Sequence, residues 1–195
     1  CAQKKGMTFI SDEIYHGLNF DGPDVSALEF NDKAIIINSF SKYFSLTGWR
    51  LGWMIAPPDM LRSIECLAQN LFISAPSLSQ VAALAAFDNH DELRENVARY
   101  AKNREILLAE LPKAGFDRLA PADGAFYIYA DIGELTNDSA EFCRLMLTEA
   151  HVAATPGLDF DPYRGNAYVR FSFAGSEDEI KRGVRRLQDW RFKAN

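Results

Sequence analysis

Cysteine is scarce in this sequence of 195 residues, which contains only Cys1, Cys66 and Cys143. An odd number of widely spaced cysteines without a C-x-x-C pair is atypical of a disulfide framework or a zinc site. The three histidines are equally scattered, and none has the spacing of metal ligands. We therefore predict no metal site and a reducing, cytoplasmic location.

Basic residues are also in deficit, because 27 acidic side chains face 21 basic ones and the net charge is −6. This balance gives no electrostatic reason to expect nucleic acid or an anionic membrane as a partner. Twelve glycines and eight prolines are too few for a disordered chain. The uncharged stretch 67–87 is long enough to span a bilayer, but Gln69, Asn70 and Pro76 suit hydrocarbon poorly. We expect it to form two buried helix segments that meet at Pro76.

Strand-like apolar runs alternate with helical patterns, which indicates an α/β fold. We expect a buried strand at 8–10, a central strand at 34–37 and a third strand at 51–56. The apolar spacing in 91–111 predicts one long amphipathic helix. The boundary between two domains, 1–95 and 96–195, is expected in or near this helix.

The second half of the sequence has a clearer pattern. Alternation predicts strands at 125–132 and 167–173, the second with Arg170 on its polar face. Helices are predicted to begin at Asp138 and at Ser176, because each is followed three residues later by a glutamate, as in a capping box.

The densest polar segment, 38–52, directly follows the strand predicted at 34–37. It contains Lys42, the hydroxyls of Ser39 and Ser41, and Arg50. Hydroxyls and arginine bind phosphate, and a lysine held beside other cations becomes a nucleophilic amine able to form Schiff bases. Ligands bind beyond the carboxyl ends of strands in open α/β sheets. On spacing alone, however, a solvated loop with Lys42 as a surface charge is the more common outcome.

Two further candidates lie outside that segment. Asp12 and Tyr15 follow the strand predicted at 8–10, and would share a sheet edge with Lys42 if the two strands are close in one parallel sheet. Taken alone, they are more often a loop acid and a packing tyrosine. Arg170 taken alone fits a solvent-facing strand residue.

Three segments together resemble one family: DEIY at 12–15, SFSKYFSLTGWRLG at 39–52 and YVRFS at 168–172. In this order and at these separations, they resemble fold-type I pyridoxal-phosphate enzymes, in particular the class I/II aminotransferases of the aspartate aminotransferase superfamily. The resemblance implies the C-terminal part of the large domain, with a mostly parallel sheet, at 1–95. It implies a small C-terminal α+β domain at 96–195.

The same resemblance implies a role for each candidate residue. Lys42 would form the Schiff base with pyridoxal 5'-phosphate and carry the proton released from the substrate. Asp12 would pair with the pyridine nitrogen, and Tyr15 would donate to the ring's phenolate oxygen. The phosphate would be held by Ser39, Ser41 and Arg50, and the substrate α-carboxylate by Arg170.

The implied reaction transfers an amino group from an amino acid to a 2-oxo acid, in a cytoplasmic homodimer. Two alternatives use the same scaffold: a regulatory domain of a transcription regulator that senses the cofactor, and a pyridoxal-phosphate-dependent lyase. The resemblance begins in the middle of the family's length, and the first residue is not methionine. We therefore expect about half of an enzyme, which would be inactive by itself.

Overall fold

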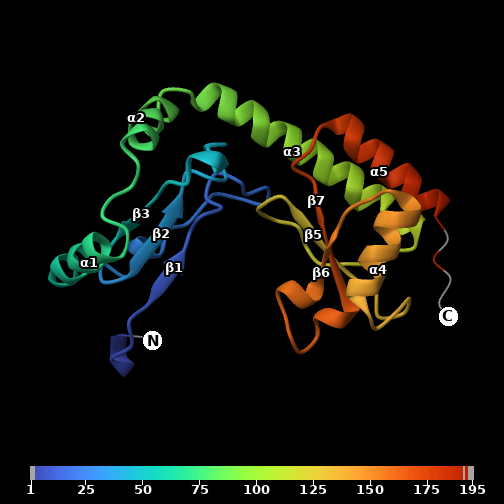
Figure 1. Ribbon diagram of the computed structural model, residues 1–195, viewed down its shortest axis with the longest axis horizontal. Coiled ribbons are helices and arrows are strands. Elements are labelled where there is room, and N and C mark those ends of the chain that lie inside the picture. Colours follow the sequence, from blue (N-terminus) through green and yellow to red (C-terminus); the bar gives the residue numbers. More distant parts are fainter. Residues whose placement is uncertain (1–2, 191, 193–195) are drawn as a thin grey trace. The chain divides into compact units, whose positions relative to one another are not determined.

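The computed structural model describes residues 3–190 and residue 192, so Cys1 lies outside the described residues (Figure 1). The chain forms two compact units: unit 1 ends at Val97 and unit 2 begins at Ala98. The division falls within α3 (His90–Glu110), which confirms the long helix predicted at 91–111.

Unit 1 contains a three-stranded sheet with β2 (Ile35–Ser39) in the centre (Figure 1). On one side β1 (Ile10–Asp12) runs parallel to β2, and on the other β3 (Gly52–Ile55) runs antiparallel to it. A parallel return normally needs a crossover helix, whereas the connection 40–51 contains only the short turn η3 (Thr47–Trp49). The described part of this sheet is therefore mixed, where the family resemblance predicted a mostly parallel one.

Burial within the sheet matches the prediction for β2 but not for β1. Ile35 and Ile36 of β2 are buried, as a central strand requires. The first strand lies at the edge, begins two residues later than predicted, and leaves the Ile10 side chain 60% exposed. The prediction of a buried first strand is therefore wrong, because an edge strand gains cover only from elements packed on its faces.

The uncharged stretch forms parts of two helices, α1 (Pro58–Leu71) and α2 (Ser77–Ala86), and Pro76 immediately precedes α2 as expected. Burial was predicted wrongly here too. None of the α1 side chains is buried, and Leu71 is 77% exposed. Helical periodicity is a local property, but burial requires an opposing surface. Among the described residues, no helix combines the length and apolar character needed to cross a membrane.

Unit 2 contains an antiparallel sheet in the order β4 (Arg118–Leu119), β5 (Tyr127–Asp131), β7 (Tyr168–Ser172), β6 (Thr155–Pro156). The predicted alternation is confirmed: Ile128 and Ala130 of β5 and Val169 and Phe171 of β7 are buried. This face forms the core of the unit, and Arg170 lies on the other face.

Helices complete the core of unit 2. α5 (Glu177–Asp189) lies along the second half of α3, joined to it by the Lys102–Glu177 ion pair (2.7 Å) (Figure 1). Ser176 and Glu179 form the predicted capping box. α4 (Ser139–Leu145) begins after Asp138, which accepts a hydrogen bond from the Glu141 N–H (3.0 Å). The remaining helical turns are η1 (Gln3–Lys5), η2 (Ala27–Glu29), η4 (Pro112–Ala114), η5 (Met146–Ala150), η6 (Gly157–Asp159) and η7 (Gly165–Ala167).

Candidate active site

Residues from three strands meet at one edge of the unit 1 sheet, the edge formed by the carboxyl ends of β1 and β2. Because β1 and β2 are parallel, Asp12 and Ser39 end their strands at the same edge. The antiparallel β3 begins there, since Gly52 pairs with Ser39, and Arg50 lies just before β3. The expectation that Asp12 and the Lys42 segment share a sheet edge is therefore confirmed.

Lys42 and Tyr15 face each other at this edge. The Lys42 Nζ lies 5.4 Å from the centroid of the Tyr15 ring, within the range of a cation–π interaction. Both side chains are half-buried. Two motifs that are separate in sequence thus meet, and the amine lies beside a phenol ring.

Arg50 and two serines form a polar cradle in the same segment. The Ser39 Oγ accepts a hydrogen bond from the Ser41 N–H (3.0 Å). The Arg50 Nη1 donates to the Ser41 Oγ (3.4 Å) and to the Thr47 carbonyl (2.9 Å). Arg50 has a left-handed backbone (φ 50°), which turns the chain into β3. Its guanidinium and the neighbouring hydroxyls are groups that bind phosphate.

Glu13, which was not among the predicted site residues, fixes the segment that carries Asp12 and Tyr15. It is only 5% exposed, and its carboxylate accepts hydrogen bonds from the Ala27 N–H (2.8 Å) and the Ser26 hydroxyl (3.2 Å). Burial, the largest influence, raises the pKa of Glu13. The hydrogen bonds and the nearby His16 together outweigh it, so the pKa is lowered. A charged residue just after an apolar strand was the available signal, but its partner Ala27 is distant in sequence.

Packing of aromatic side chains holds the Lys42 segment in place. Phe40 is buried, with its ring centroid 5.0 Å from that of Phe44, 4.8 Å from Trp53 and 5.6 Å from Phe87. The hydroxyl of Tyr43, which follows Lys42 in the chain, lies 3.1 Å from the His90 Nδ1. Residues on both sides of Lys42 are therefore held by distant parts of unit 1.

Arg170 is the one predicted site residue in unit 2. Its guanidinium carbon lies 4.0 Å from the ring centroid of Tyr127 and 4.0 Å from that of Phe160. Tyr127 comes from β5, and Phe160 follows η6. Sequence alternation placed Arg170 on its face of β7, but it gave no sign of Phe160 as a neighbour.

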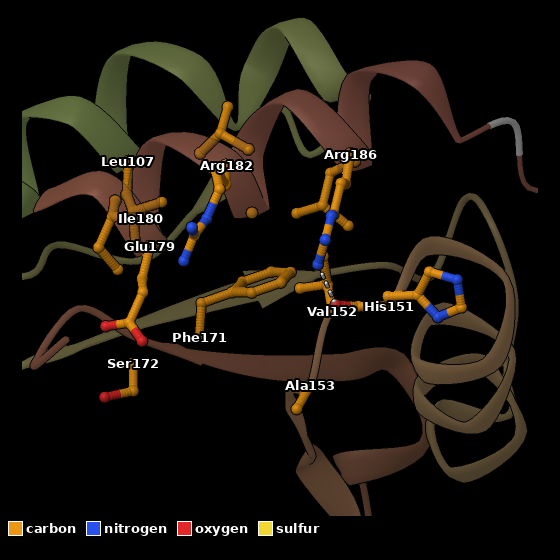
Figure 2. Close-up of a pocket in the computed structure, with 13 residues that line it drawn as sticks. Leu107, His151, Val152, Ala153, Phe171, Ser172, Glu179, Ile180, Arg182 and Arg186 are labelled. Atoms are coloured by element: carbon orange, nitrogen blue, oxygen red, sulfur yellow. Dashed lines mark hydrogen bonds between the residues drawn. The ribbon is translucent and has the colours of Figure 1, made fainter. Parts of the chain in front are cut away.

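A separate pocket of about 410 Å³ lies between α5, β7 and residues 151–153. Figure 2 shows Arg182 and Arg186 extending from α5 into the pocket, with Arg186 donating to the His151 carbonyl (3.1 Å). Phe171 and Arg170 are successive strand residues and lie on opposite faces of β7. None of the predicted site residues lines this pocket.

Metal-ligating and thiol groups are sparse around these sites. Within residues 3–190 and 192, no three or more His, Cys, Asp or Glu side chains form a metal-binding group. Burial, and to a lesser degree the nearby Asp159, raises the pKa of the Cys143 thiol to about 11. Cys143 is therefore a neutral core residue near pH 7.

Comparison with known proteins defines the class. The family described as aminotransferase class I and II matches residues 1–187. The chain therefore belongs to the class I and II aminotransferases.

Individual relatives agree with this assignment. The chain is 48% identical over 188 residues to a valine–pyruvate aminotransferase of Mycobacterium tuberculosis, matching 94% of this chain and 48% of that protein. It is 41% identical to a (5-formylfuran-3-yl)methyl phosphate transaminase of Methanocaldococcus jannaschii, matching 93% and 49%. A crystal structure of an aminotransferase from Mycobacterium tuberculosis matches with a TM-score of 0.93 at 46% identity, over 97% and 50%. The chain spans about half the length of the curated relatives it matches.

Proposed function

We propose that the protein containing this chain is a pyridoxal-phosphate-dependent aminotransferase, which moves an amino group from an amino acid to a 2-oxo acid. The observation that carries the proposal is the Lys42 amine beside the Tyr15 ring, at the sheet edge shared with Asp12 and Arg50. This donor set occurs in a member of the class I and II aminotransferases, a family that depends on pyridoxal 5'-phosphate.

The residues at the sheet edge fit that cofactor by their chemistry. Asp12 offers a carboxylate to a protonated ring nitrogen, and Tyr15 offers a phenol hydroxyl to the ring oxygen. Ser39, Ser41 and Arg50 offer hydroxyls and a guanidinium to the phosphate. Lys42 offers the only amine in this set for attachment.

Each side chain then has a defined task. When bound, the cofactor supplies a ring that withdraws electrons from the substrate α-carbon. The Lys42 Nζ accepts the proton from that carbon and later delivers a proton in the reverse sense. Asp12 keeps the ring nitrogen protonated through its negative charge. Arg170 grips the α-carboxylate with paired N–H groups, and so orients the bond that breaks.

The finer assignment follows the same proposal. We propose that the chain corresponds to the C-terminal half of its relatives, with 1–95 belonging to the large domain and 96–195 forming the small one. Support comes from the order of the three motifs, and the matched share of each relative is consistent with a half of either kind. We further propose a cytoplasmic location and a homodimer. The exposed apolar side chains of α1 and α2 support the association of two copies.

Borohydride reduction of the intact protein loaded with pyridoxal 5'-phosphate tests the attachment site. Peptide mapping should find the phosphopyridoxyl group on Lys42, and Lys42→Arg should abolish both labelling and turnover of an amino acid with a 2-oxo acid. Lys33, exposed near the start of β2 and away from this edge, is the matched control: Lys33→Arg should change neither. Labelling of Lys33, or turnover by Lys42→Arg, would contradict the proposal. The 195-residue chain alone should not convert an amino acid and a 2-oxo acid.

A further inference from the structure

Arg170 is held by aromatic rings, whereas three other arginines of unit 2 are held by acids. Arg118 pairs with Asp131, Arg144 with Glu141 and Arg164 with Asp161. Within the described residues, no carboxylate forms an ion pair with Arg170. Its guanidinium carbon instead lies 4.0 Å from each of two ring centroids, those of Tyr127 and Phe160.

The strand register explains the contact with Tyr127. Arg170 of β7 pairs with Tyr129 of β5, and Tyr127 pairs with Ser172. Tyr127 and Tyr129 are two residues apart, so both lie on the Arg170 face of the sheet. A diagonal neighbour on an antiparallel pair is within reach of a long side chain.

Phe160 lies in a tightly closed loop, which places its ring beside Arg170. A Cβ on Gly157 would lie 2.6 Å from the Gly165 carbonyl oxygen, so only glycine permits this approach of the two backbones. The Phe160 N–H donates to the Gly157 carbonyl (2.9 Å), and the Gly165 N–H to the Asp161 carbonyl (2.8 Å). Phe160 is thus placed by backbone geometry, independently of β5.

We propose that Tyr127 and Phe160 are positioning residues that hold Arg170 ready for the α-carboxylate of the substrate; this rests on the aminotransferase function proposed above. Cation–π attraction holds a guanidinium without an oxygen acceptor, so it leaves N–H groups for an incoming carboxylate. An internal acid would hold the side chain equally well, but it would compete with the substrate for the same donors. Two rings give order without that competition.

The test compares amino acids with amines in the intact protein. Tyr127→Leu and Phe160→Leu should lower kcat/KM for an α-amino acid roughly 3- to 30-fold relative to kcat/KM for an alkylamine without a carboxylate. Tyr127→Phe and Phe160→Tyr keep a ring and should keep the ratio. Tyr163→Leu, in the same loop but 93% exposed, is the matched control and should also keep it.

The outcomes separate this inference from the function on which it rests. If the wild type turns over but the leucine variants keep the wild-type ratio, the positioning role is overturned and the function stands. If the wild type does not turn over, the function fails, and NMR of the Arg170 Nε–H during titration with propanoate decides the inference. A shift on titration in the wild type and in Tyr127→Phe, but not in the leucine variants, supports it. No shift in the wild type, or equal shifts in all variants, overturns it.

Discussion

Unit 2 closes its own core, whereas unit 1 leaves large apolar side chains exposed. Phe142 of α4 is 1% exposed and contacts Phe116, whose ring in turn packs edge-on against Phe171. In unit 1, Ile10 and Leu71 remain largely exposed. The difference shows that regular secondary structure can form without a closed core, because unit 1 has regular helices and strands but leaves many apolar side chains exposed.

The candidate cofactor residues all lie in the more open unit, so local links must hold them. Glu13 ties the Asp12–Tyr15 segment to the turn at Ser26, and Phe40 ties the Lys42 segment to α2 through Phe87. Unit 2 has a different device: the buried Asn103 of α3 donates to the carbonyls of residues 173 and 175 at the end of β7. The geometry of the candidate site in unit 1 therefore depends on a few contacts, and each of them can be tested by mutation.

The largest expected contrast is between core truncations in the two units. Phe142→Ala should lower the free energy of unfolding of unit 2 by roughly 3–5 kcal/mol, because it opens a cavity in a closed core. Leu71→Ala removes a side chain that is 77% exposed and should change the stability of unit 1 by no more than about 0.5 kcal/mol. Hydrogen exchange read by peptide mass resolves the two units. An equal loss from both variants would show that Leu71 is buried in solution.

A smaller contrast lies within unit 1, at two glycines. A Cβ on Gly17 would lie 2.4 Å from the Tyr43 ring, whereas one on Gly22 would meet nothing within 4 Å. Both have positive φ, so backbone strain affects both alanine variants. Gly17→Ala should cost roughly 1–3 kcal/mol more than Gly22→Ala, since it displaces the ring of Tyr43, the residue that follows Lys42 in the chain.

Denaturant unfolding and phosphopyridoxyl labelling measure this pair. Gly17→Ala should also reduce labelling of Lys42 in the intact protein, while Gly22→Ala should not. Equal stability and equal labelling in the two variants would mean that Tyr43 moves freely, and would remove the argument that packing fixes the lysine segment.

The sequence predicted features that depend on neighbouring residues better than features that depend on residues far apart in the chain. The alternation around Arg170 and the capping box at Ser176 are local patterns, and both are confirmed. The shared edge of Asp12 and Lys42 followed once two strands were assumed parallel. The exposure of Ile10 was missed because burial depends on which surfaces meet.

Long-range side-chain contacts were the other gap. Phe160 contacts Arg170, and His90 contacts Tyr43, although no local sequence pattern links the two members of either pair. Glu13 resembled any loop acid until its partner at Ala27 was known. These contacts hold the candidate site residues in place, so the sequence predicted where the candidate groups lie better than it predicted what holds them.

A helix-cap mutation extends the comparison to a smaller scale. Ser176→Ala should destabilise unit 2 by about 1 kcal/mol, because the Ser176 Oγ accepts from the Glu179 N–H at the start of α5. Ser63 is exposed in the interior of α1, where alanine favours the helix more than serine does. Ser63→Ala should therefore leave unit 1 unchanged or stabilise it by a few tenths of a kcal/mol, roughly. Hydrogen exchange in α5 and α1 reads the two effects, and a loss in α1 would contradict the exposed position of Ser63.

The smallest expected effect is the acid response of Glu13. In the folded chain its pKa is lowered from the usual 4.5. Its ionised form therefore stabilises unit 1 fully at pH values above 4.5. The contribution is lost as the pH falls through the lowered pKa, because the unfolded chain then binds the proton more readily. Ser26→Ala removes one donor to the carboxylate, which raises the folded pKa and moves the loss to higher pH. Exchange in residues 8–30 between pH 3 and pH 6 should show this shift, with Ser63→Ala as the control. The same acid profile in both variants would mean that the Ser26 hydroxyl does not stabilise the Glu13 carboxylate.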